Sequence, residues 1–160
     1  MANSLESWLQ SLLGNKLKEV FALTYAFDSE KDFVNPQALD IRFESSHKGV
    51  LRGSEDGESV SWCEEDILES RDLGNHGSES IEQVSHLQVW ATALGRQLQN
   101  FEIIISSQVD RPVGIALAFE NNIWICVLNY GDELCVFDEV PKDILDAEGF
   151  TFQKSLAGDE

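Results

Sequence analysis

The sequence predicts an α+β fold, built from two diverged copies of a helix plus four-stranded antiparallel meander that pack as one compact domain. Apolar residues spaced three to four apart give way to apolar residues at every second position, and this order occurs twice along the chain. The 160 residues, 42% of them hydrophobic, are enough to bury one sizeable core. We expect residues 1–69 to form the first copy, 70–79 a linker, 80–154 the second copy and 155–160 a frayed tail.

Each copy is expected to begin with a helix that buries one face. A capping residue followed three positions later by Glu or Gln marks each start, and Gly14 and Gly95 mark the ends, where a positive φ is required. The capping pairs are Asn3 with Glu6 and Ser80 with Gln83. The apolar faces are Leu5, Trp8, Leu9 and Leu12 in the first helix, and Val84, Leu87, Ala91 and Leu94 in the second.

Four strands are expected after each of these glycines, because apolar residues then alternate with polar or small ones. Their ranges are 17–27, 39–43, 50–52 and 59–62 in the first copy, and 101–105, 115–119, 123–128 and 134–137 in the second. A short acidic loop with a Gly is expected to join the last two strands of each copy. Pro141 suits the first turn of a short helix after the last strand.

The two predicted sheets differ in polarity. Asp40 and Arg42 alternate with apolar residues in the first copy, whereas Ala116 and Ala118 take the equivalent places in the second, where residues 123–128 are apolar on both faces. The second sheet is therefore expected to be covered on both sides, by the helices, by the first copy or by another subunit.

The chain has a net charge of −18, since 29 Asp and Glu oppose only 11 Lys and Arg, and this charge limits the classes of partner that it can bind. Such a field repels nucleic acid and anionic lipid, and it speeds encounter with a positively charged protein. We therefore expect a basic protein partner, and neither a nucleic-acid nor a membrane partner.

The cysteines and the apolar runs point to a soluble cytoplasmic protein. Cys63, Cys126 and Cys135 are odd in number and lack CxxC spacing, which argues against a disulfide framework and a zinc ribbon. The first residues lack the basic start of a signal peptide, and the longest apolar runs are too short to span a membrane.

The motifs that carry catalysis are missing from the sequence. It contains no GxSxG, no EF-hand spacing and no glycine-rich phosphate loop. His47, His76 and His86 fall respectively in a polar loop, in the expected linker and on the expected second helix. We expect no catalytic residue, no metal site and no cofactor, and hence a protein that is not an enzyme.

Acidic residues near the ends of the predicted hairpins are the candidate partner-binding residues. Trp62 and Tyr130 lie beside them and could anchor an interface, although such aromatic residues more often fill a core. The acids themselves could equally form a solvated rim. The acidic candidates are Glu55, Asp56, Glu58, Glu64, Glu65, Asp66 and Glu69 in the first copy, and Asp132, Glu133, Asp138 and Glu139 in the second.

Residues 113–137, VGIALAFENNIWICVLNYGDELCVF, carry a family resemblance. A Phe-Glu-Asn turn between two strands and then a Gly-Asp-Glu-Leu turn make this segment resemble immunity proteins of bacterial contact-dependent growth inhibition systems, which are encoded beside polymorphic toxins. The resemblance implies a cytoplasmic antitoxin that binds one cognate toxin domain, often a basic nuclease, and blocks it. It identifies no individual binding residue.

A different class of function fits the same sequence. The chain could be a homodimeric scaffold or regulatory subunit whose apolar second sheet forms the interface and whose acidity serves only solubility. A concentration-dependent dimer would distinguish this hypothesis from the antitoxin.

Overall fold

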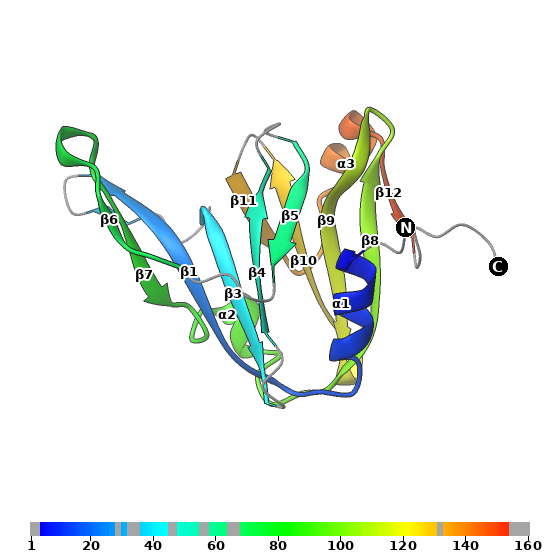
Figure 1. The fold of residues 1–160 in the computed structure, drawn as a ribbon. Helices are drawn as coiled ribbons and strands as arrows, with labels where there is room; N and C mark the ends of the chain where they lie inside the picture. The colour runs from blue at the N-terminus through cyan, green and yellow to red at the C-terminus, as the bar shows by residue number, and fades with distance from the viewer. Residues whose placement is uncertain are drawn as a thin grey trace.

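The computed structural model describes residues 4–27, 30–31, 36–44, 48–54, 58–63, 68–130 and 133–153. Two antiparallel sheets make up most of the described chain, with few helices (Figure 1). The predicted α+β class is therefore confirmed. The capping residue Asn3 and the tail 155–160 lie outside the described residues.

The first sheet has the strand order β5-β4-β3-β1-β7-β6, and β2 pairs with β1 at one end. Its strands are β1 (Leu17–Phe27), β2 (Glu30–Lys31), β3 (Ala38–Phe43), β4 (Lys48–Gly53), β5 (Val60–Cys63), β6 (Arg71–Asp72) and β7 (Ser78–Gln83). The strands predicted at 17–27, 39–43, 50–52 and 59–62 correspond to β1, β3, β4 and β5.

The second sheet has the strand order β11-β10-β9-β8-β12. Its strands are β8 (Leu98–Ser106), β9 (Val109–Phe119), β10 (Ile123–Tyr130), β11 (Glu133–Phe137) and β12 (Phe150–Gln153). A helix, α3 (Lys142–Glu148), separates β11 from β12. It begins directly after Pro141, as the sequence predicts, and ends at Gly149, which has a φ of 65°.

The predicted second helix is wrong. Ser80 and Gln83 do not cap a helix but belong to β7, which pairs antiparallel with β1. The helix α2 (Gln88–Ala91) is a single turn, and it buries Trp90 while Ala91 is exposed. The pairing with β1 satisfies the backbone groups of 78–83, which overrides the local capping pattern.

The first helix, by contrast, forms as predicted. Helix α1 (Ser4–Leu12) buries all four residues of its expected apolar face, and it contacts β8 and, through Trp8, Gly49 of β4. Gly14 and Gly95 both have positive φ, at 85° and 76°. Two single turns of 3-10 helix, η1 (Gly74–His76) and η2 (Glu120–Asn122), complete the described helices, none of which is both long and apolar enough to cross a membrane.

The main core lies between the two sheets. It contains apolar residues of α1, of β1, β3, β4 and β5, and of β8 to β11. A second cluster covers the other face of the second sheet, where Ile144 and Leu145 of α3 pack against Ala116, Cys126 and Leu128. The first sheet and α3 therefore supply the two covers that the apolar second sheet requires.

A bulge near the start of β1 reverses the faces that alternation alone would assign. The register with β3 shifts between Leu17 and Glu19, so that Leu17, Val20 and Ala22 all join the main core. Leu23 instead packs in a small cluster on the opposite face. The same shift occurs between Leu98 and Asn100 at the start of β8.

Hydrogen bonds between the starts of β1 and β8 join the two sheets reciprocally. The amide of Gly14 donates to the carbonyl oxygen of Leu98 at 2.8 Å, and the amide of Gly95 donates to that of Leu17 at 2.8 Å. The amides of Leu17 and Leu98 then donate to Arg96 and Asn15 respectively, at 3.1 and 3.0 Å.

Candidate partner-binding groove

A groove of about 700 Å³ lies on the face of the second sheet that α3 partly covers. Three carboxylates, two aromatic rings and one thiol line it, and we call it the acidic groove. These residues are Glu102, Asp138, Glu139, Trp124, Phe152 and Cys126. Among the described residues that line the acidic groove, none is Lys or Arg.

Small residues of β9 lie between the two strands that supply Glu102, Trp124 and Cys126 to the groove. In the sheet register, Ala116 pairs with Glu102 on one side and with Cys126 on the other. Two residues further along β9, Ala118 pairs with Trp124. Ala116 and Ala118 are themselves buried, so the groove is lined by the longer side chains of the neighbouring strands and not by open space over β9.

The turn that precedes β10 orients Trp124. Asn121 and Asn122 in this turn have φ values of 66° and 60°, the left-handed region that Asn tolerates better than most residues. The indole Nε1–H of Trp124 donates a hydrogen bond to Oδ1 of Asn122 at 3.3 Å. One end of the half-buried ring is thus held, and Trp124 lines the groove.

The three carboxylates of the acidic groove all raise the pKa of one thiol, that of Cys126. The thiol of Cys126 is buried, and its pKa is raised to about 11, first by this burial and then by the negative charges of Glu102, Asp138 and Glu139. Among the described residues, no three His, Cys, Asp or Glu side chains are grouped closely enough to hold a metal ion.

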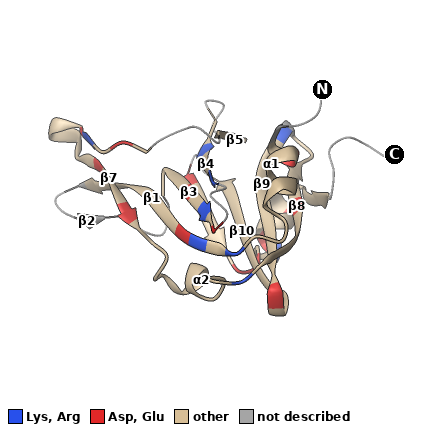
Figure 2. Ribbon diagram, turned by 60° about the horizontal axis from the view of Figure 1, so that its bottom comes forward, with Lys and Arg blue, Asp and Glu red and all other residues tan. Residues whose placement is uncertain are grey.

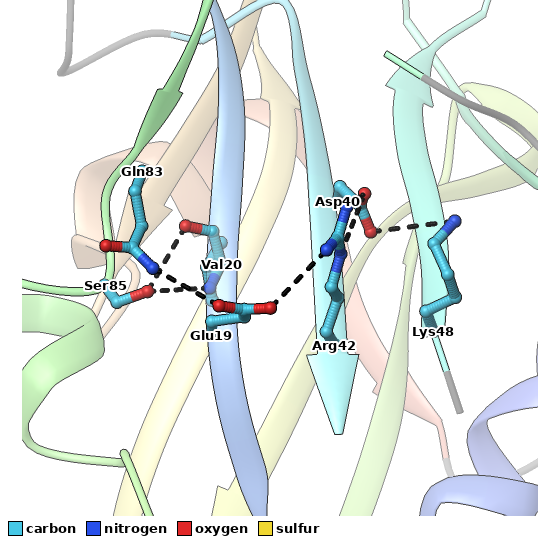
Figure 3. A network of polar contacts seen from close by, with 7 residues as sticks. All are labelled: Glu19, Val20, Asp40, Arg42, Lys48, Gln83 and Ser85. Atoms are coloured by element: carbon cyan, nitrogen blue, oxygen red, sulfur yellow. Dashed lines mark hydrogen bonds and ion pairs between the residues drawn. The ribbon is translucent and has the colours of Figure 1, made fainter. Parts of the chain in front are cut away.

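The corresponding face of the first sheet carries its own cations. Arg42 donates to Asp40 Oδ2 from Nη2 at 3.0 Å and from Nε at 3.2 Å, and its Nη1 donates to Glu19 at 3.4 Å (Figure 3). Lys48 Nζ lies 3.8 Å from Asp40 Oδ1. Figure 2 shows acidic and basic residues on β1 and β3 and basic residues on β4. These charges pair with one another, whereas the described lining of the acidic groove contains carboxylates and neither Lys nor Arg.

The structure separates the predicted partner-binding residues into different groups. Glu58, Glu69, Asp138, Glu139 and Tyr130 are exposed, and Glu133 is half-buried. The remaining acidic candidates, Glu55, Asp56, Glu64, Glu65, Asp66 and Asp132, lie outside the described residues.

Trp62 belongs to the protein interior rather than to a free surface. Its ring stacks on Trp8 with 5.0 Å between centroids and an interplanar angle of 15°, and it packs against the main core. This is the alternative role that the sequence left open for the aromatic candidates.

Of the predicted residues that the structure describes, Asp138 and Glu139 line the acidic groove and the others do not. Sequence reasoning missed Glu102 and placed Trp124 only in an apolar strand. The available signal was an acid at position 102 within an otherwise apolar strand, on the face where Ala116 and Ala118 replace Asp40 and Arg42. Comparison of the chain with protein-family models, with curated proteins and with solved structures gave no match.

Proposed function

We propose that the chain is an antitoxin, an immunity protein that binds a basic toxin domain through acidic surface and thereby neutralises it. The observation that carries the proposal is the acidic groove, where Glu102 of β8 meets Asp138 and Glu139 of the segment after β11 beside Trp124. Carboxylates beside an aromatic ring, with no Lys or Arg among the described residues of the groove lining, favour a cationic partner, and the net charge of −18 would speed its approach.

The resemblance of residues 113–137 to immunity proteins supports the same assignment. Its Phe-Glu-Asn turn precedes β10 and contributes the Asn residues next to Trp124. In this proposal the protein acts in the cytoplasm and performs no reaction of its own. A basic nuclease domain is the toxin that best matches the charge.

We further infer that the two halves are diverged copies of one unit, held together as a single domain. Supporting this, β1, β3, β4 and β5 are neighbours in that order, and β8, β9, β10 and β11 are neighbours in the same way. The bulges after Leu17 and Leu98 match, and the hydrogen bonds of Gly14 and Gly95 are the same bond with the halves exchanged. Duplication followed by divergence accounts for the difference between two equivalent faces. Charged residues pair with one another on the first sheet, and the second sheet carries the acidic groove.

Co-expression tests the proposed function. A toxin domain encoded beside the gene is produced in a sensitive bacterium with and without this chain, and survival is counted. We expect the chain to restore growth, and the purified pair to form a complex whose affinity falls as salt rises. Killing that continues at full rate, with no complex detected at low salt, would rule out the antitoxin.

A further inference from the structure

We propose that the acidic groove receives an arginine side chain of the partner protein, whose guanidinium lies against Trp124 and pairs with the surrounding carboxylates. The inference rests on the proposed function, since it names the chemical group by which the partner is held. A difference between the two sheets of this chain supports it.

The first sheet shows how this fold accommodates a guanidinium. The Cζ atom of Arg42 lies 4.5 Å from the ring centroid of Phe21, and its nitrogens bind Asp40 and Glu19. One aromatic ring and two carboxylates thus hold one arginine on the face of the sheet directed away from the main core. The arginine comes from β3 of the same chain.

Neighbouring strands of the second sheet pair in the same order as those of the first sheet, but an alanine takes the place of the arginine. In the first sheet Arg42 pairs with Glu19 and Lys48, and in the second sheet Ala118 pairs with Asn100 and Trp124. In each sheet these three paired residues come directly after a bulge, which lies at the start of β1 in the first sheet and at the start of β8 in the second. The second sheet therefore carries Ala118 at the place from which Arg42 extends in the first.

The acidic groove offers the groups that a guanidinium needs, at other positions than in the first sheet. Asn100, Ala116 and Glu102 stand in the second sheet where Glu19, Asp40 and Phe21 stand in the first. Glu102 and Trp124 stand on opposite sides of β9, and Asp138 and Glu139 close the groove from the segment after β11. A planar guanidinium can stack on an indole ring and offer its remaining N–H groups to carboxylates, whereas a lysine ammonium is a compact charge without such a plane. We therefore assign arginine rather than lysine as the side chain that fits.

Binding of two labelled peptides of equal length and charge, hexa-arginine and hexa-lysine, tests the assignment on the full chain. We expect hexa-arginine to bind about fivefold more tightly or better, because stacking adds to charge. Ala118→Arg should place the chain's own guanidinium in the groove and weaken hexa-arginine binding at least about tenfold. Ser61→Arg makes the same charge change on an exposed position of β5 and should weaken it less than about threefold.

A second variant guards against failure of Ala118→Arg to fold. Glu139→Gln removes one exposed groove charge while keeping the shape of the side chain, and it should reduce the preference for hexa-arginine over hexa-lysine. Equal binding of the two peptides by the unmodified chain, or equal losses in Ala118→Arg and Ser61→Arg, would overturn the proposal. If folded Ala118→Arg still binds and neutralises the toxin domain normally, the arginine assignment is wrong while the antitoxin stands. If no toxin domain is ever bound, the antitoxin itself fails, whatever the peptides do.

Discussion

The ring of Trp8 lies flat against Gly49, so close that a Cβ atom built on this glycine would come within 2.5 Å of the indole. The same ring stacks on Trp62 and donates from Nε1 to the carbonyl oxygen of Lys48 at 3.1 Å. Helix α1 is thereby fixed to β4 and β5 through a single side chain. The absence of a side chain at Gly49 is what allows this contact.

Gly49→Ala should destabilise the fold, because the added methyl group overlaps Trp8. We expect the free energy of unfolding to fall by about 1–3 kcal/mol, the usual cost of overpacking a core. Chemical denaturation monitored by tryptophan fluorescence measures the change. Ser61→Ala at an exposed position of β5 is the control, and equal stability of the two variants would show that α1 does not depend on this contact.

Asp40 and Arg42 should show strong energetic coupling. The carboxylate of Asp40 is 4% exposed, so loss of Arg42 would leave it buried with only Lys48 at 3.8 Å as a partner among the described cations. We expect Arg42→Ala to cost about 1–2 kcal/mol of stability, less than a fully buried pair because the Arg42 side chain is 41% exposed.

The double variant Asp40→Ala with Arg42→Ala should recover part of that loss. It reproduces the residues that the second sheet carries at 116 and 118, and it leaves no buried charge without a partner. A double-mutant cycle from urea denaturation gives the coupling energy. Strictly additive losses would show that the two side chains do not support each other.

Cys126 should report the charge of the acidic groove. In a variant with Cys63→Ser and Cys135→Ser, we expect thiolate absorbance to titrate with a pKa of about 11. Glu102→Gln should lower this pKa, because one of the negative charges that oppose ionisation is removed. Glu44→Gln, on the exposed end of the first sheet, should leave it unchanged. An identical pKa in all three proteins would mean that Glu102 does not act on the thiol.

The same thiol makes stability depend on pH in a defined direction. Its pKa is raised from 9.0 to about 11 in the folded protein, so the folded state holds this proton more tightly than the unfolded state. Its contribution to stability is therefore fully present below pH 9.0 and is lost as the pH rises through about 11. Cys126→Ser should flatten the fall in unfolding free energy across that interval. An unchanged slope would contradict the assignment.

The sequence predicts the strands of this fold better than its short helices. Residues 17–27 and 123–128 show their structure in local patterns of apolar residues, and both ranges form strands. Residues 78–83 are mostly polar, and their pairing with β1 joins positions that are far apart in the sequence. No local pattern records such a pairing, so the capping pair Ser80 and Gln83 predicted a helix instead.

The acidic groove could be predicted only in part for the same reason. Asp138 and Glu139 belong to a conspicuous acidic run, but Glu102 joins them only through the registers of β8 with β9 and of β9 with β10. The position of Trp124 beside Ala118 likewise depends on the register of β9 with β10. The sequence does contain the difference between Arg42 and Ala118, whose meaning becomes clear once the two registers are compared.

The association rate constant of the chain with its toxin domain tests the central claim most directly. It is measured for the unmodified chain, for Glu139→Lys in the acidic groove and for Glu44→Lys on the exposed end of the first sheet, at about 50 mM and about 300 mM salt. We predict that Glu139→Lys slows association about tenfold at low salt and much less at high salt, and that Glu44→Lys has a clearly smaller effect. Equal rates for the two variants would contradict binding through the acidic groove.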